Sequence, residues 1–121
     1  MASSRGYVIV VEDEPEILDL FQDILASEDY RFLGFNHPYQ LTNLTTRADL
    51  FLIDIMLPAL NGLTVARELK SNGYARTPMI ATSASDRLLT QAKQSGLFAA
   101  TVPKPFDVQD LLSLVAAHIR A

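Results

Sequence analysis

The sequence predicts an α/β fold built on an open parallel sheet with helices on both faces. Five short apolar runs alternate with segments of helical periodicity, and the connections between them are short. Closing a barrel from such units takes about eight of them. The sheet is therefore expected to be open and doubly wound, with its ligand site at the carboxyl ends of the central strands.

Length and composition set the first limits. A chain of 121 residues is long enough for one core and too short for two, so we expect a single domain over residues 1–121. The sequence has no cysteine, which excludes disulfides and thiolate metal sites. No run approaches the roughly 18 apolar residues of a membrane span, and the N-terminus lacks the apolar core of a signal peptide. We therefore expect a cytoplasmic protein with no membrane insertion.

Charge argues against one class of partner. The formal net charge is −4, with 20% charged and 49% hydrophobic residues, which is ordinary for a compact soluble protein. Proteins that bind nucleic acid usually carry a basic field, and this chain has none. Direct nucleic acid binding is not expected.

The first elements follow from apolar runs and helix signals. Residues 7–11 are apolar and mostly β-branched, which predicts a buried strand. Pro15 suits the first turn of a helix, and apolar residues at helical spacing continue that helix to about residue 27. Residues 31–35 form a shorter and more mixed run, which predicts a strand at or near the edge of the sheet.

The middle of the chain carries the most buried segment. Residues 39–46 are predicted as a weak helix, because only two leucines serve as its apolar positions. Residues 50–54 place four large apolar side chains in an unbroken row before Asp54, which predicts a strand buried on both faces. Asp54 either caps the next turn or carries chemistry at the end of the strand, and this segment alone favours neither interpretation.

Three more elements are predicted in the second half. A helix over residues 63–69 ends before Asn72 and a glycine, a typical helix stop. A strand over residues 79–83 ends in hydroxyl side chains. The next helix, residues 86–95, has few apolar residues to bury, so we expect it to be weakly anchored.

The chain ends with a strand and a helix. Residues 99–102 are predicted as the fifth strand, which runs into a segment containing Lys104. Asp107 is a good N-cap for the last helix, whose apolar stripe continues to Ile119.

Polar side chains follow four of the five strands, at one edge of the expected sheet. If the first and third strands are neighbours, three carboxylates crowd together, which is costly unless a cation lies among them. Oxygen ligands without histidine or cysteine favour a hard divalent ion, Mg²⁺ above all. A lysine and a hydroxyl at the same place can bind a phosphoryl group. The residues are Glu12, Asp13, Asp54, Thr82, Ser83 and Lys104.

These residues resemble the receiver domains of response regulators in two-component signalling, and the resemblance covers about residues 7–120. Each feature is weak alone, but four in the right order and at the ends of the right strands are specific. The features are the pair Glu12-Asp13, the spacing of Asp54, Pro58 and Gly62, the pair Ser83-Ala84, and Lys104-Pro105-Phe106.

The resemblance implies a (βα)5 flavodoxin-like fold with strand order 2-1-3-4-5, which puts Asp13 beside Asp54. It implies that Asp54 is the phosphoacceptor. Asp13, Asp54 and the backbone carbonyl of Met56 would bind Mg²⁺, and Glu12 would act through a metal-bound water.

The resemblance also implies a switch. Lys104 would pair with the phosphoryl group, Ser83 Oγ would move to hydrogen-bond it, and the peptide bond between Lys104 and Pro105 would be cis. The family usually has an aromatic residue three positions before the lysine. Here that position is Thr101, so the switch position is altered.

The function implied is that of a phosphoacceptor domain rather than an enzyme. A histidine kinase or a histidine phosphotransfer protein would donate a phosphoryl group from phosphohistidine to Asp54, and the domain would assist its own phosphorylation and dephosphorylation. A downstream protein that the sequence does not identify would read the change. The chain would be a stand-alone receiver or one excised from a larger regulator or hybrid kinase.

Two other functions are weighed against this one. A degenerate receiver would act as a phosphorylation-independent protein-binding module, but the complete set of Asp13, Asp54, Ser83 and Lys104 argues against it. A phosphatase of the haloacid-dehalogenase type would carry a second carboxylate two residues after the nucleophile. That position is Met56, which argues against such an enzyme.

Overall fold

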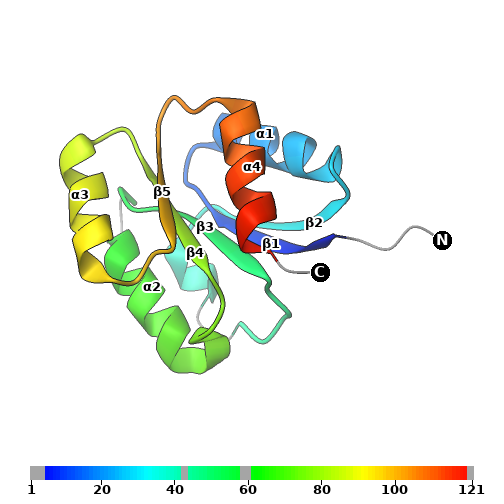
Figure 1. Ribbon diagram of the computed structural model, residues 1–121. Coiled ribbons are helices and arrows are strands. Elements are labelled where there is room, and N and C mark those ends of the chain that lie inside the picture. The colour runs from blue at the N-terminus through cyan, green and yellow to red at the C-terminus, as the bar shows by residue number, and fades with distance from the viewer. Residues whose placement is uncertain (1–4, 42–43, 58–60, 120–121) are drawn as a thin grey trace.

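The computed structural model describes residues 5–41, 44–57 and 61–119 (Figure 1). Pro58 of the Asp54 motif and residue 120 at the end of the expected domain lie outside the described residues. Among the described residues, no helix combines the length and the apolar character needed to cross a membrane.

Five parallel strands form one sheet in the order β2-β1-β3-β4-β5, which confirms the predicted order and the edge position of the second strand. Each apolar run of the sequence became a strand, with bounds that shift by at most a residue. The strands are β1 Gly6–Val11, β2 Tyr30–Phe35, β3 Leu50–Asp54, β4 Met79–Ser83 and β5 Ala100–Pro103.

The helices cover both faces of this sheet, as expected for a doubly wound fold. Helices α1 and α4 lie on one face, and α2 and α3 lie on the other (Figure 1). The predicted N-cap of α4 is present, since the Asp107 side chain accepts a hydrogen bond from Asp110 N–H; Gly96 ends α3 with φ 74°. The α-helices are α1 Pro15–Ala26, α2 Gly62–Leu69, α3 Asp86–Ser95 and α4 Val108–His118.

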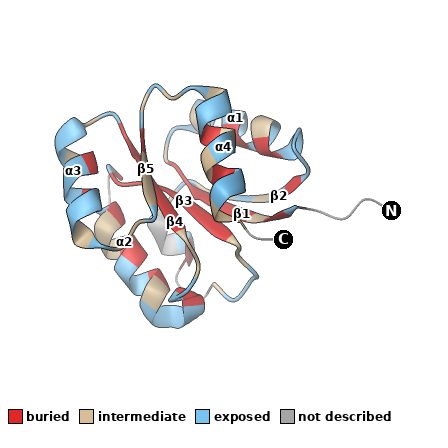
Figure 2. Cartoon of the chain, viewed as in Figure 1, coloured by how far each residue is buried: buried red, intermediate tan, exposed pale blue. Residues whose placement is uncertain are grey.

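The central strands supply side chains to both faces, because successive residues of a strand point to opposite sides. In β3, Leu50 and Leu52 pack with α1 and α4, whereas Phe51 and Ile53 pack with α2. All five residues of β3 are buried, and the central strands of the sheet are formed mostly of buried residues (Figure 2). This double burial explains why the run is apolar without alternation.

The prediction of a helix over residues 39–46 is wrong. The chain forms only a short 3₁₀ helix, η1 (Pro38–Leu41), and residues 44–49 are not helical. The segment 42–46 is rich in threonine and contains asparagine, residues with low helix propensity, and it offers few apolar side chains to hold a helix on the sheet. Outside η1, the described residues of the second connection are therefore irregular.

Helix α2 ends differently from a simple stop. A wide π-type turn, η2 (Lys70–Tyr74), follows it, and Gly73 there has φ 109°. This backbone conformation favours glycine, which explains the Asn-Gly stop in the sequence.

Candidate functional site

Asp54 is the last residue of β3 and lies at the carboxyl edge of the sheet. It is 4% exposed, and its Oδ1 accepts a hydrogen bond of 2.9 Å from Met56 N–H. It pairs in register with Thr82 of β4. Burial and this hydrogen bond hold the carboxylate in one orientation, and its second oxygen, Oδ2, faces Lys104.

Gly62 packs directly against the backbone that carries Asp54. Its N–H donates a hydrogen bond of 3.3 Å to the carbonyl of Ile55. A Cβ atom at this position would lie 2.5 Å from Ile55 Cα and 2.8 Å from the carbonyl oxygen of Asp54. Only glycine fits without moving the backbone, which gives a physical reason for the glycine of the Asp54 motif.

The structure brings together the three predicted carboxylates. Glu12 and Asp13 directly follow β1, which neighbours β3 in the sheet. One carboxylate oxygen from each of Glu12, Asp13 and Asp54 lies within 4.8 Å of the others. Glu12 is fully buried and Asp13 is half-buried, so the cluster has an accessible side.

Lys104 reaches the cluster from the end of β5. Its Nζ lies 2.6 Å from Glu12 Oε1 and 3.2 Å from Asp54 Oδ2. Its backbone N–H donates a 2.9 Å hydrogen bond to the carbonyl of Ser83. The peptide bond between Lys104 and Pro105 is cis. The contact with Asp54 agrees with the expected site, whereas the contact with Glu12 was not predicted.

Burial controls the charges in this site. It raises the pKa of Glu12 to about 7, because it penalises the charged form; the contact with Lys104 opposes this shift and the charge of Asp54 adds to it. Burial alone would lower the pKa of Lys104, but its contacts with Glu12 and Asp54 outweigh that effect and raise the pKa. Lys104 therefore stays charged, and it is the cation that the buried acids share.

The cluster fits a hard divalent cation. Three carboxylates face one ammonium group, so the site retains negative charge. Buried Glu12 Oε1 forms an ion pair with Lys104 but has no aligned hydrogen-bond partner among the described residues. Carboxylate oxygens without nitrogen or sulfur donors are the ligands that Mg²⁺ prefers.

Ser83 lies at the same edge, but among the described residues its side chain is not hydrogen-bonded to the acidic cluster. Its Oγ accepts a 3.0 Å hydrogen bond from Ser85 N–H, while Ser85 Oγ caps α3 by accepting from Leu88 N–H at 3.2 Å. Ser85 is thus the helix cap. In the described part of the chain, Ser83 Oγ makes no hydrogen bond to Asp54 or Lys104.

The altered switch position lies on β5. Thr101 is half-buried and pairs in register with Ala81 of β4. The side chain of Met56 is 56% exposed, and only its N–H is bound to Asp54. The roles of Thr101 and of the Met56 carbonyl remain predictions.

One contact that supports the site was missed. Phe106 stacks on Phe21 of α1, with 5.1 Å between ring centroids and an angle of 16° between the ring planes. The pair ties the loop that carries Lys104 to the helix that follows Glu12 and Asp13. The signal was in the sequence, since Phe21 lies on the apolar stripe of the first helix.

Comparison with known proteins identifies the family. Residues 8–116 match the response regulator receiver domain family, and the chain belongs to this family. It is 33% identical over 116 residues to the response regulator GtcR of Aneurinibacillus migulanus, which covers 93% of this chain and 47% of GtcR. It is 32% identical over 118 residues to the response regulator ArlR of Staphylococcus saprophyticus, covering 93% of this chain and 52% of ArlR. The chain spans about half the length of these curated relatives.

Solved structures agree with the fold. The response regulator TrrA of Thermotoga maritima, solved in complex with Mg²⁺ and a beryllium fluoride, has a TM-score of 0.84 at 24% identity, covering 94% of this chain and 99% of TrrA. The receiver domain of the sensor histidine kinase PA1611 of Pseudomonas aeruginosa, solved with magnesium in its active-site cleft, has a TM-score of 0.82 at 26% identity. That match covers 97% of this chain and 98% of the PA1611 domain.

Membership of this family sets the general function. The chain is a receiver domain of two-component signalling with an acidic site suited to Mg²⁺, and it is a signalling domain rather than a dedicated enzyme. Receiver domains take their phosphate from histidine kinases.

Proposed function

We propose that Asp54 accepts a phosphoryl group from the phosphohistidine of a histidine kinase or histidine phosphotransfer protein. The observation that carries this proposal is the arrangement around Asp54. Its buried carboxylate has one oxygen held by Met56 N–H and the other 3.2 Å from Lys104 Nζ. A nucleophile held in this way needs little reorganisation before attack.

The transfer balances without a further reagent. An oxygen of Asp54 forms a bond to phosphorus while the phosphorus–nitrogen bond of phosphohistidine breaks, and the imidazole nitrogen leaves with the electron pair. Lys104 Nζ, already beside Asp54, would neutralise the negative charge of the transferred oxygens. The second ring nitrogen of the phosphohistidine carries a proton when the bond breaks, so the products are an aspartyl phosphate and a neutral histidine.

Asp13, Asp54 and the backbone carbonyl of Met56 would hold Mg²⁺, and Glu12 would act through a bound water. The bound ion would supply positive charge for the phosphoryl oxygens. Support comes from the three clustered carboxylates, which share only the one ammonium group of Lys104 among the described residues. In the structure, Lys104 contacts the acidic residues. We expect its side chain to turn from Glu12 towards the phosphoryl group when Asp54 is phosphorylated.

The switch would run through the end of β4. We propose that Ser83 Oγ leaves Ser85 N–H and hydrogen-bonds the phosphoryl group, which would shift the start of α3. Helix α3 buries only Leu89 and Ala92, so moving it should cost little. A downstream protein partner would read this change. A single domain over residues 1–121, a cytoplasmic location and the absence of direct nucleic acid binding belong to the same proposal.

Phosphorylation with a small-molecule donor tests the acceptor. The protein is incubated with acetyl phosphate and Mg²⁺, and its intact mass is measured. We expect one added phosphoryl group, no addition when the metal is chelated, and none on the Asp54→Ala variant. Asp23 is an exposed aspartate, so Asp23→Ala is the matched control and should be labelled like the wild type. Labelling of Asp54→Ala at the wild-type rate would show that another residue is the acceptor, and no labelling of the wild type would favour the phosphorylation-independent binding module.

A further inference from the structure

The short η1 leaves one corner of the sheet open. On the face of β1 and β2 that carries η1, Leu41 packs with Ile9 and Val11 near the carboxyl ends of the strands. Midway along β2, Leu33 is 41% exposed. A pocket of about 250 Å³ opens there, between β1, β2 and the connection before β3. Among its lining residues are Tyr7, Ile9, Arg31, Leu33, Thr46 and Arg47.

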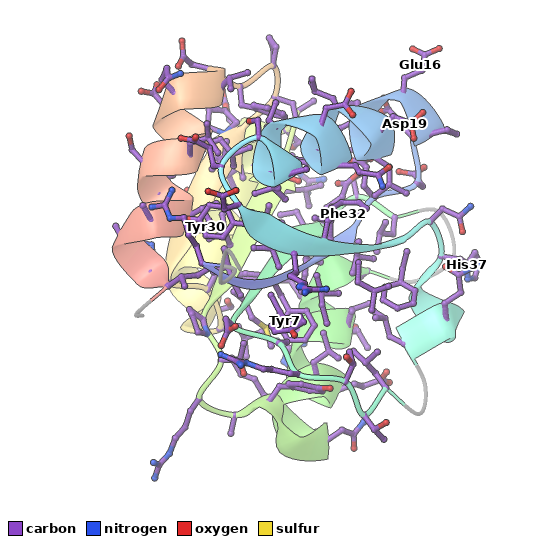
Figure 3. All side chains as sticks on the ribbon, turned by 90° about the vertical axis from the view of Figure 1, so that its right-hand side faces the viewer. Tyr7, Glu16, Asp19, Tyr30, Phe32 and His37 are labelled. Atoms are coloured by element: carbon purple, nitrogen blue, oxygen red, sulfur yellow. The ribbon has the colours of Figure 1, made fainter. Side chains whose placement is uncertain are left out.

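Register shows which side chains share this face. Tyr7 pairs with Arg31, and Ile9 pairs with Leu33, so these four side chains project from the same side of the sheet. Phe32 packs in the cluster on the other face, with α1. Figure 3 looks onto this edge of the molecule and shows Tyr7 and Phe32 on opposite sides of strand β2.

The pocket is basic at its rim. The guanidinium carbons of Arg47 and Arg31 lie 5.0 and 5.9 Å from the centre of the Tyr7 ring. Arg47 is paired with Asp49 at 3.3 Å, whereas Arg31 makes no ion pair within the described parts of the chain. In a chain of net charge −4, this corner thus presents an uncompensated positive charge beside apolar surface. Its chemistry suits an anionic group with an apolar neighbour.

The position of the pocket favours an extended peptide as the occupant. Strand β2 is the outer strand of the sheet, so its outer edge has no strand partner in the described structure. Such an edge can accept a further strand through main-chain hydrogen bonds, with alternate side chains filling adjacent pockets. Sites for drug-sized molecules usually exceed about 300 Å³, and this pocket of about 250 Å³ is closer to the size of one side chain and its neighbours.

We propose that β2 and this pocket form a docking site for an extended acidic segment of a partner protein. An apolar side chain of that segment would pack on Leu33, and its carboxylates would lie against Arg31 and Arg47. This site lies over the amino-terminal and middle parts of β1 and β2, whereas Asp54 is at the carboxyl end of β3. Docking there goes beyond phosphoryl transfer and does not require it.

A pair of labelled peptides tests the proposal by fluorescence anisotropy. One is a short peptide of alternating glutamate and valine with a central phenylalanine, and the other has lysine in place of glutamate. We expect only the acidic peptide to bind, and Arg31→Glu to weaken it at least about tenfold, because attraction is replaced by repulsion. Leu33→Ser should also weaken binding, and both replaced side chains are exposed, so the fold should survive. Arg67→Glu on α2 is the charge-matched control and should have no effect, since its side chain is exposed and belongs to another element.

Mapping separates this site from the phosphoryl site. Amide shifts caused by the acidic peptide should centre on β2 and Tyr7, and the Asp54→Ala variant should bind the peptide as well as the wild type. Three binding results would overturn the proposal: no binding of the acidic peptide, equal binding of the lysine peptide, or equal weakening by Arg31→Glu and Arg67→Glu. Full competition by benzoate alone would also overturn it, because that result would indicate a small-anion site. Self-association of the free protein that Arg31→Glu abolishes would assign the surface to a second copy instead.

Discussion

At the scale of single residues, Lys104 has two tasks that compete. In the structure it neutralises Glu12 and Asp54, at 2.6 and 3.2 Å, and in the proposed transfer it must meet the phosphoryl group. Glu12 is fully buried and Lys104 is largely buried, so neither charge is well solvated without its partner. Lys104 and a divalent ion therefore compete for the same acidic site.

This competition predicts opposite effects of two substitutions. Without divalent ions, Lys104→Met should lower the free energy of unfolding by about 3 kcal/mol, because two buried carboxylates lose their cation. Mg²⁺ should then stabilise this variant more than the wild type, while phosphoryl transfer is impaired. Asp13→Ala should instead weaken Mg²⁺ binding. Urea unfolding with and without Mg²⁺ measures both effects.

The control for the lysine is Lys93→Met, an exposed position on α3 that should leave unfolding and Mg²⁺ binding unchanged. Equal losses of Mg²⁺ affinity in Lys104→Met and Asp13→Ala would show that Lys104 does not compete with the metal.

Gly62 makes a second prediction at this scale. Gly62→Ala should lower the free energy of unfolding by about 2 kcal/mol, because the added Cβ meets backbone atoms that cannot yield without shifting Asp54. The labelling rate with acetyl phosphate should fall with it. Gly96→Ala is the comparison, since no atom lies within 4 Å of its added Cβ and only its positive φ is strained. Gly96→Ala should lose stability without slowing the labelling, and a Gly62→Ala variant with wild-type labelling would contradict this account.

At the scale of elements, the loop between β5 and α4 is anchored at both sides. Lys104 N–H is bound to the carbonyl of Ser83, and Phe106 stacks on Phe21 of α1. Phe21 is buried, so the stack fixes the loop to the core of the molecule. The side chain of Lys104 is therefore carried by a segment that is fixed at Lys104 itself and again two residues later at Phe106.

We therefore predict that Phe106 acts on the chemistry through Lys104. Phe106→Ala should slow phosphoryl transfer and lower the free energy of unfolding by about 2 kcal/mol, less than for a fully buried ring. Phe106→Leu keeps apolar contact with Phe21 and should restore most of the stability and much of the rate. Labelling rates and urea unfolding of both variants give the comparison. A Phe106→Ala variant with lower stability and an unchanged rate would limit the stack to a structural role.

The elements also show what could be predicted from the sequence. Strands β1, β3 and β4 were predictable because burial on both faces demands apolar runs, and the site followed because parallel strands deliver their end residues to one edge. The conformation of residues 39–46 could not be predicted in this way. Their helix propensity is weak, so tertiary packing decides the outcome. The ion pair of Glu12 with Lys104 depends on side-chain reach between distant strands, which periodicity does not encode.

At the scale of the whole molecule, the question is how a change at Asp54 is transmitted to the surface of the domain. Thr101 replaces the ring that the family resemblance led us to expect, and it is half-buried beside Ala81. A small β-branched side chain cannot sweep out the volume of a ring. Helix α3 is the alternative route, because its cap follows Ser83 directly and its buried contacts are few.

We expect a beryllofluoride complex to perturb amides mainly in residues 56–62, 83–89 and at Lys104, with small changes near Thr101. Amide chemical shifts recorded with and without beryllofluoride and Mg²⁺ give the map, and hydrogen exchange should be faster in α3 than in α1. The Asp54→Ala variant serves as the control that should show no change. Large shifts centred on Thr101 with a quiet α3 would contradict this route.

The alternation within β3 constrains how this domain can vary over evolutionary time. Leu50 and Leu52 belong to one cluster, and Phe51 and Ile53 belong to the other. A replaced side chain disturbs one side of the sheet, whereas one inserted or deleted residue would exchange both sides and carry Asp54 away from the edge. We expect descendants of this sequence to change residue types along β3 but not its length, and to place their insertions in the connection over residues 44–49.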